Sequence, residues 1–139
     1  VLLAAQNVHA DEAGAFTGEV SISMLEDLGC RYALIGHSER RQLFGEQDAE
    51  IASKAVRLHG SSVRPILCVG ETLEERDRGA TLDVVGQQLS SVLEVADGLG
   101  RLAGISAELL NGSGFGCQRR FSGPPRVRKT FARILVSIL

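Results

Sequence analysis

The segment YALIGHSERR, residues 32–41, decides the fold class and raises the question of function. Its mostly apolar run, Tyr32–Ile35, is continuous rather than alternating, which is typical of a strand covered on both faces. Directly after Gly36 come an imidazole, a hydroxyl, a carboxylate and two guanidinium groups, with no spacer between them. In α/β proteins ligands gather where parallel strands end and loops begin, so this cluster is a candidate site.

Outward from this segment, apolar runs alternate with helical patterns. Strands are predicted at residues 1–8, 32–35 and 65–69. Helices are predicted at 22–28, capped by Ser21, at about 46–59, and after each of the caps Thr72 and Thr81. The helix after Thr81 carries its apolar side chains on one stripe: Val85, Leu89, Val92 and Ala96. The order of strand and helix repeats at roughly thirty residues, which predicts parallel β/α units. Such units belong either to a doubly wound sheet or to part of an eight-stranded barrel.

The composition is that of a single domain of 139 residues, or part of one. Apolar residues make up 44% of the chain, and no run approaches the roughly 20 apolar residues that a membrane span needs. Cys30, Cys68 and Cys117 have no paired spacing, which favours buried thiols over disulfides or metal ligands. Free thiols indicate a reducing compartment, and we therefore expect a cytoplasmic protein.

His37 is the residue whose position suggests chemistry. If a helix begins after Gly36, the backbone N–H groups at its start disfavour a charged imidazolium. A neutral imidazole can donate a hydrogen bond to a substrate carbonyl and share a proton with an enediolate. Glu39 would be a second acid–base group or would hold an arginine, and Ser38 would cap the turn. The alternative is a helix cap with a surface ion pair and no catalytic role.

Four motifs resemble the triosephosphate isomerases in order and spacing: AAQNV (4–8), GAFTGEVS (14–21), GHSERR (36–41) and ILCVGETLEER (66–76). The resemblance implies a partial TIM (β/α)8 barrel, with residues 1–103 holding units three to five. It also implies interconversion of dihydroxyacetone phosphate and glyceraldehyde 3-phosphate through an enediol(ate), in glycolysis and gluconeogenesis. The family needs no metal and no organic cofactor.

The same resemblance assigns the site residues. His37 matches the electrophile of this family, which is a neutral histidine at a helix N-terminus. Glu39 and Ser38 match supporting groups of the active site, and Asn7, beside Gln6, matches the substrate-binding end of the third strand. The third loop would reach into the neighbouring subunit of a homodimer, with Thr17 at its tip and Glu19 and Arg40 holding it.

Much of the family's catalytic machinery has no match in this sequence. The Asn and Lys of the first strand, in an NWK-type motif, are missing, and so are the Gly-rich phosphate loops of strands seven and eight. The general-base Glu lies in a YEPVWAIGTG-type segment, whereas Glu108 has no such surroundings. We therefore expect the printed chain to be inactive alone.

Residues 104–139 form a basic tail that does not match the family. Residues 1–103 hold 9 Lys and Arg against 16 Asp and Glu, a balance of −7, whereas the tail balances at +5. We expect the tail to be irregular, and either disordered or the product of a shifted reading frame. The frame shift is suggested by SGPPRVRKTFAR (122–133), which can be back-translated so that a reading frame one base later resembles the family's A-T-P-E-Q-A motif. The alternatives are a non-catalytic paralogue and a module that binds nucleic acid through the tail, although the tail carries no nucleic-acid-binding signature.

Overall fold

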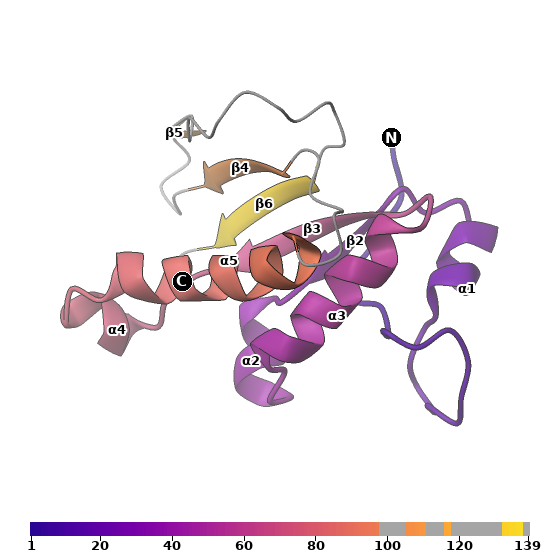
Figure 1. Ribbon diagram of the computed structural model, residues 1–139, viewed down its shortest axis with the longest axis horizontal. Helices are drawn as coiled ribbons and strands as arrows, with labels where there is room; N and C mark the ends of the chain where they lie inside the picture. The colour runs from indigo at the N-terminus through magenta and orange to yellow at the C-terminus, as the bar shows by residue number, and fades with distance from the viewer. Residues whose placement is uncertain (98–104, 111–115, 118–131, 138–139) are drawn as a thin grey trace.

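The computed structural model describes residues 1–97, 105–110, 116–117 and 132–137, with side chains through residue 95. Within these ranges six strands form one sheet in the order β1-β2-β3-β6-β4-β5 (Figure 1). The strands are β1 (Ala4–Ala5), β2 (Tyr32–Ile35), β3 (Arg64–Val69), β4 (Ile105–Leu110), β5 (Gly116–Cys117) and β6 (Ala132–Ser137). All neighbours are parallel except β4 and β5, which are antiparallel.

The first three strands confirm the predicted parallel β/α units. Tyr32 pairs with Ala4 on one side and with Arg64 on the other, which fixes the register of the three strands. β2 has the predicted bounds, and β3 begins one residue earlier than predicted. β1 is shorter than the predicted strand, because only Ala4 and Ala5 pair with β2 before the chain turns into a loop. The sheet is partial and open.

Five helices lie within the described residues. They are α1 (Ile22–Asp27), α2 (Ser38–Leu43), α3 (Asp48–His59), α4 (Leu73–Asp77) and α5 (Thr81–Asp97). Helices α3 and α5 pack side by side against the sheet, and α1 and α4 lie toward opposite ends of the molecule (Figure 1). The short helix α2 was not predicted as a separate element. It places residues 38–43 directly beyond the end of β2.

Of the three predicted N-caps, Ser21, Thr72 and Thr81, the first two are confirmed. Ser21 Oγ accepts a hydrogen bond from the Met24 N–H at 3.3 Å, and Thr72 forms a capping box with Glu75. α3 ends at His59 with Gly60 as its C-cap, which agrees with the predicted end of this helix. The prediction for Thr81 was wrong, because Thr81 is the first residue of α5 and the Ala80 carbonyl before it accepts from the Val84 N–H.

The core lies between the sheet and helices α3 and α5. Its fully buried side chains include Val8, Ile35, Ile51, Leu58 and Val63, and Val92 of α5 joins them while Val85 and Leu89 pack at its edge. Leu28, the last residue of the predicted helix 22–28, lies at the C-cap of α1 and is exposed. The side chain of Ala96 lies outside the described residues.

The cysteine prediction is confirmed where the side chains are described. Cys30 and Cys68 are buried and free of disulfide bonds. Burial raises the pKa of the Cys68 thiol to about 11, so this thiol stays protonated at neutral pH. The side chain of Cys117 lies outside the described part of the chain.

Strands β4, β5 and β6 fall in the tail and were not predicted. β6 pairs with β3 from Ile66↔Arg133 to Val69↔Val136, and therefore occupies the edge where a fourth parallel strand belongs. The rest of the tail and the side chain of Glu108 lie outside the described residues, so the predicted frame shift stays a prediction. Along the described helices, none is long and apolar enough to cross a membrane.

Candidate functional site

His37 lies where β2 ends and α2 begins, as the sequence predicted. Gly36 turns the chain with a φ of +73°, a conformation that favours glycine, and His37 then occupies the N-cap position of α2. Its Nδ1 accepts a hydrogen bond from the backbone N–H of Glu39 at 3.3 Å. The imidazole is 34% exposed, so one edge of the ring faces the helix start and another remains accessible.

This hydrogen bond determines which nitrogen of the neutral ring carries the proton. A nitrogen that accepts a hydrogen bond cannot hold the proton, so the neutral ring must carry it at Nε2. His37 Nε2 is therefore a hydrogen-bond donor. A donor of this kind can polarise a carbonyl without bringing a positive charge to the site.

The two neighbours of His37 differ in their surroundings. Ser38 Oγ is buried and has no hydrogen-bond partner among the described residues. The Glu39 side chain is 74% exposed, and its Oε2 lies 3.9 Å from His37 Nδ1. Both arginines of the motif pair with other carboxylates among the described residues, Arg40 with Glu19 and Glu46 and Arg41 with Asp48.

Arg41 fixes the turn that carries His37. Its Nε donates to the Gly36 carbonyl at 2.8 Å, and its Nη1 lies 2.5 Å from Asp48 Oδ1 at the start of α3. The second guanidinium nitrogen, Nη2, is buried without a hydrogen-bond partner in the described part of the chain. Arg41 therefore ties the end of β2 to α3.

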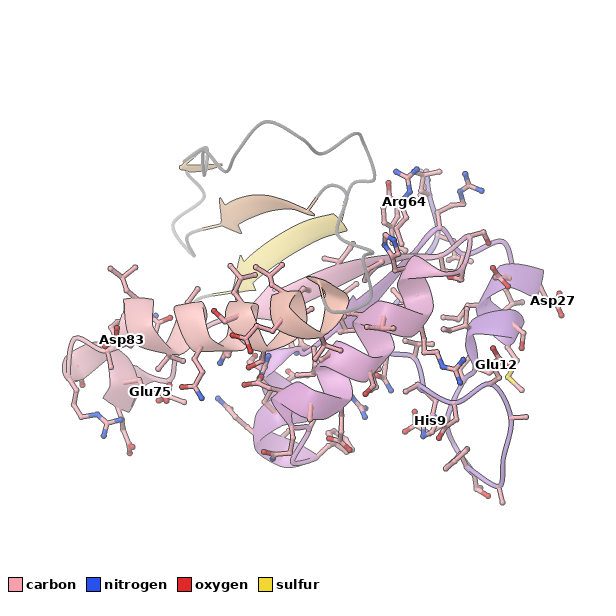
Figure 2. The ribbon with its side chains drawn as sticks, viewed as in Figure 1. His9, Glu12, Asp27, Arg64, Glu75 and Asp83 are labelled. Atoms are coloured by element: carbon pink, nitrogen blue, oxygen red, sulfur yellow. The ribbon has the colours of Figure 1, made fainter. Side chains whose placement is uncertain are left out.

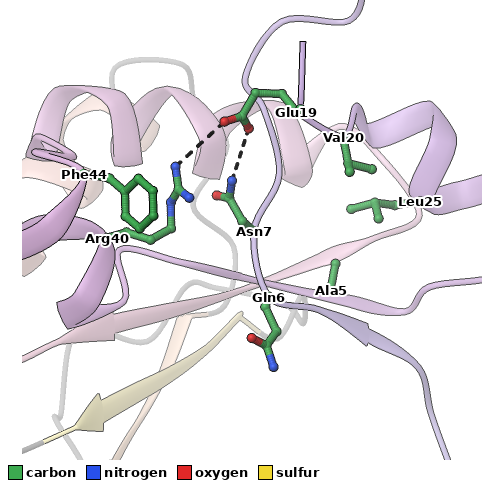
Figure 3. A pocket seen from close by; sticks show the side chains of 9 residues that line it. Ala5, Gln6, Asn7, Glu19, Val20, Leu25, Arg40 and Phe44 are labelled. Atoms are coloured by element: carbon green, nitrogen blue, oxygen red, sulfur yellow. Dashed lines mark hydrogen bonds and ion pairs between the residues drawn. The ribbon is translucent and has the colours of Figure 1, made fainter. Parts of the chain in front are cut away.

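A closed circuit of polar contacts joins Asn7, Glu19, Arg40, Glu46 and Lys54. Asn7 Nδ2 donates to Glu19 Oε2 at 3.2 Å, and Glu19 Oε1 lies 3.9 Å from Arg40 Nη2 (Figure 3). Arg40 Nε donates to Glu46 Oε1 at 3.4 Å, and Lys54 Nζ donates to the same oxygen. Lys54 Nζ also donates to Asn7 Oδ1 at 2.9 Å, which closes the circuit.

The circuit bears on the predicted role of Asn7. The Asn7 amide donates to Glu19 and accepts from Lys54, so its orientation is fixed by two charged groups. Gln6 is exposed and points away from Asn7 (Figure 3). Contact between Asn7 and a substrate stays a prediction. In the structure Asn7 lies between the charged side chains of Glu19 and Lys54.

The loop that follows Asn7 is held at several points. The His9 ring stacks on Phe16 with 4.0 Å between ring centroids, and the His9 N–H donates to the Val20 carbonyl at 2.9 Å. Glu12 pairs with Arg57 of α3 at 3.3 Å, and His9 and Glu12 lie on the side of this loop that faces α3 (Figure 2). Thr17, near the end of the loop, is exposed.

A pocket of about 440 Å³ opens beside this loop. Its lining combines polar groups of the circuit with apolar side chains from β1, the loop, α1 and the end of α2: Ala5, Gln6, Asn7, Gly18, Glu19, Val20, Leu25, Arg40 and Phe44. Arg40 lies over the Phe44 ring at 5.0 Å from its centroid. The structure thus brings Asn7, Glu19 and Arg40 together in one pocket.

Glu71 is a buried carboxylate just beyond the end of β3. Its Oε1 accepts from Arg76 Nε at 3.0 Å and from Thr81 Oγ1 at 3.4 Å, whereas Oε2 has no hydrogen-bond partner within the described residues. Burial raises the pKa of this carboxyl. Hydrogen bonds from its own backbone N–H, from Arg76 and from Thr81 outweigh burial, so the pKa ends below its usual value.

Sequence reasoning assigned no role to Glu46 or Lys54, and it noted the turn that holds Glu71 without assigning a role to the carboxylate. A signal existed for Lys54, because it lies on the stripe of α3 that carries Ile51 and Leu58, where a charge is out of place. Glu46 and Glu71 lie in loops without periodicity and gave no such signal. Among the described residues, no group of three or more His, Cys, Asp or Glu is arranged to hold a metal ion.

Comparisons with known proteins agree with the sequence motifs. The family model for triosephosphate isomerase matches residues 1–102. The triosephosphate isomerase of Halorhodospira halophila is 52% identical over 98 residues, which cover 70% of this chain and 39% of that protein. Those of Alcanivorax borkumensis and Thiobacillus denitrificans are 56% identical over 92 residues and 54% over 99, covering 66% and 71% of this chain and 37% and 40% of those proteins. The chain spans about two fifths of these relatives.

Proposed function

The chain belongs to the triosephosphate isomerase family, and from this membership we propose that it forms part of an isomerase acting on triose phosphates. The reaction is the interconversion of dihydroxyacetone phosphate and glyceraldehyde 3-phosphate through an enediol(ate). It requires a base that removes a carbon-bound proton and a donor that polarises the carbonyl. This chain supplies the donor.

His37 is the proposed electrophile. The observation that carries the proposal is the hydrogen bond from the Glu39 N–H to His37 Nδ1, which places the proton of the neutral ring on Nε2. Donation from Nε2 to the substrate carbonyl stabilises the oxyanion as the enediolate develops. In its neutral form the ring can donate the Nε2 proton to one oxygen of the enediolate and take a proton back from the other oxygen.

The neighbouring residues have supporting roles in this proposal. Ser38 and Glu39 help to position the His37 ring, and Asn7 lies just after β1, at the end of the strand where substrate would bind. Side-chain atoms of Ser38, Arg41 and Glu71 that lack hydrogen-bond partners in the described chain lie just after the ends of β2 and β3. We place the protein in the cytoplasm.

The proposal includes a homodimer. Thr17 would lie at the tip of a loop that enters the partner's pocket, with Glu19 and Arg40 holding the base of that loop. The exposure of Thr17 and the open pocket beside Glu19 and Arg40 support this arrangement. No observation on the described residues favours the nucleic-acid-binding module or the non-catalytic paralogue.

A chimera tests the proposal. Residues 1–102 of this chain, the part that the family model matches, replace the corresponding segment of the Thiobacillus denitrificans enzyme, so that the host supplies the remaining barrel units. We expect a folded dimer with isomerase activity in a coupled assay. His37→Asn in the chimera should lower kcat by about 10² to 10⁴-fold, because a positioned proton donor contributes that much.

His59→Asn is the matched control, since His59 is an exposed residue at the end of α3. The control should keep the activity of the chimera. A chimera that folds, as judged by circular dichroism, but does not turn over triose phosphate would refute the proposed function. A folded and active monomer would refute only the dimer.

A further inference from the structure

The charge circuit is formed by Asn7, Glu19, Arg40, Glu46 and Lys54, and two of its charged side chains are buried. Lys54 is 7% exposed and Glu46 is 4% exposed. A buried ammonium or carboxylate is costly unless an opposite charge and hydrogen bonds compensate it. In this circuit each of the two compensates the other, and neither is needed for the chemistry assigned to His37.

Glu46 depends on a single oxygen for its compensation. Its Oε1 accepts from both Arg40 and Lys54, whereas Oε2 is buried without a hydrogen-bond partner in the described chain. Removing the ammonium of Lys54 would leave Glu46 with Arg40 alone, at 3.4 Å. Arg40 would then be drawn toward Glu46 and away from its longer contact with Glu19.

Lys54 also reaches the loop by a second route. Its Nζ orients the Asn7 amide, whose Nδ2 in turn holds Glu19 at the end of the 9–19 loop. Both routes from Lys54, through Asn7 and through Glu46 and Arg40, therefore end on the two oxygens of Glu19. Glu19 is the point where the loop meets the body of the protein.

We propose that Lys54 is a positioning residue that holds the 9–19 loop in one conformation through the charge circuit. The loop is otherwise tied to the body by the His9 N–H, by the stacking of His9 on Phe16 and by an exposed ion pair between Glu12 and Arg57. Exposed ion pairs contribute little, so the buried circuit carries most of the restraint. The proposal does not depend on isomerase chemistry.

Hydrogen exchange measured by mass spectrometry on the 139-residue chain tests the proposal. Lys54→Met keeps the length and packing of the side chain and removes its charge. We expect exchange of the amides in residues 9–20 to accelerate by at least about tenfold, while peptides covering β3 change far less. Glu19→Gln, a milder change at a partly exposed position, should accelerate exchange in the same peptide by a smaller factor.

Arg57→Met is the matched control, because Arg57 joins the same helix to the same loop through the exposed pair with Glu12. It should leave exchange in residues 9–20 within about twofold of the original chain. Equal exchange in the Lys54 and Arg57 variants would overturn the proposal. So would a uniform acceleration across β3 and the loop in Lys54→Met together with no change in Glu19→Gln, because the role of Lys54 would then be general stability.

Discussion

Gly36 is the residue on which the geometry of the site depends most directly. Its φ of +73° lies in the left-handed region, and a Cβ built there would come within 3.0 Å of the Cys68 carbonyl oxygen and 3.1 Å of Ile51 Cδ1. The first neighbour is backbone of β3 and cannot move aside cheaply. The turn that presents His37 therefore requires glycine for two separate reasons, backbone conformation and space.

Gly36→Ala should destabilise the chimera by about 2 to 4 kcal/mol, because left-handed strain and a close backbone contact add together. Urea denaturation gives the free energy of unfolding. Gly86→Ala serves as the control: Gly86 lies within α5 with open space around its Cα, so alanine there should stabilise by up to about 1 kcal/mol. A Gly36→Ala variant as stable as the parent would contradict this account of the turn.

At the scale of single residues, the sequence predicted the position of residues that directly follow a recognisable strand or helix in the chain. His37 follows a buried strand directly, so its place at the end of β2 could be inferred. The partners of the charge circuit could not, because Lys54 and Asn7 are 47 positions apart and meet only through the fold. For the same reason, the sequence pattern gave no sign that the Asn7 amide is hydrogen-bonded to both Glu19 and Lys54.

At the scale of elements, prediction succeeded where burial is continuous. β2 and β3 are covered runs with turn residues at their ends, and both were predicted within one residue. β1 was predicted too long at both ends, because the apolar residues at 1–3 and Val8 carry no information about which residues pair with β2, and only Ala4 and Ala5 do. A helix start after Gly36 was considered, but no bounds were predicted for α2, because it has six residues and no buried side chain and so leaves no apolar period to detect.

Glu71 links three elements, since it follows β3 and accepts hydrogen bonds from Arg76 of α4 and Thr81 of α5. Its pKa lies below the usual value in the folded chain, so the folded state favours the carboxylate. Such a group contributes stability that is fully present above the pKa of the unfolded chain. That contribution is lost as the pH falls from there through the lower pKa of the folded state.

Glu71→Gln should therefore lower the stability of the chimera by about 1 to 3 kcal/mol at pH 7, because a buried acceptor of charge-assisted hydrogen bonds is weakened. The difference from the parent should shrink as the pH falls below about 4.5, where the parent begins to lose the same contribution. Thermal melts between pH 3 and 7 measure both effects. Glu74→Gln, at an exposed neighbouring position, is the control, and a pH-independent difference for Glu71→Gln would contradict the assignment.

At the scale of the whole molecule, the β/α order determined the parallel sheet but not its closure. Three units fit a doubly wound sheet as well as a barrel, and only the resemblance of the four motifs favoured the barrel. In the described chain the sheet is open, with two-residue strands β1 and β5 at its edges. Open edges leave backbone hydrogen-bonding groups available to other chains, and we expect the isolated chain to be marginally stable.

Because several catalytic motifs of the family have no match in this sequence, we expect low isomerase activity from the 139-residue chain alone. In the proposed function His37 is the electrophile, but the sequence has no match for the family's general-base Glu, first-strand Lys or Gly-rich phosphate loops. The 139-residue chain alone should therefore turn over triose phosphate at least about 10²-fold more slowly than the chimera, since the missing base alone contributes ~10² to 10⁴-fold. A coupled assay on the purified chain, with the chimera assayed in parallel, makes the comparison. Turnover by the chain within tenfold of the chimera would mean that residues 1–139 contain a base that the motifs do not reveal.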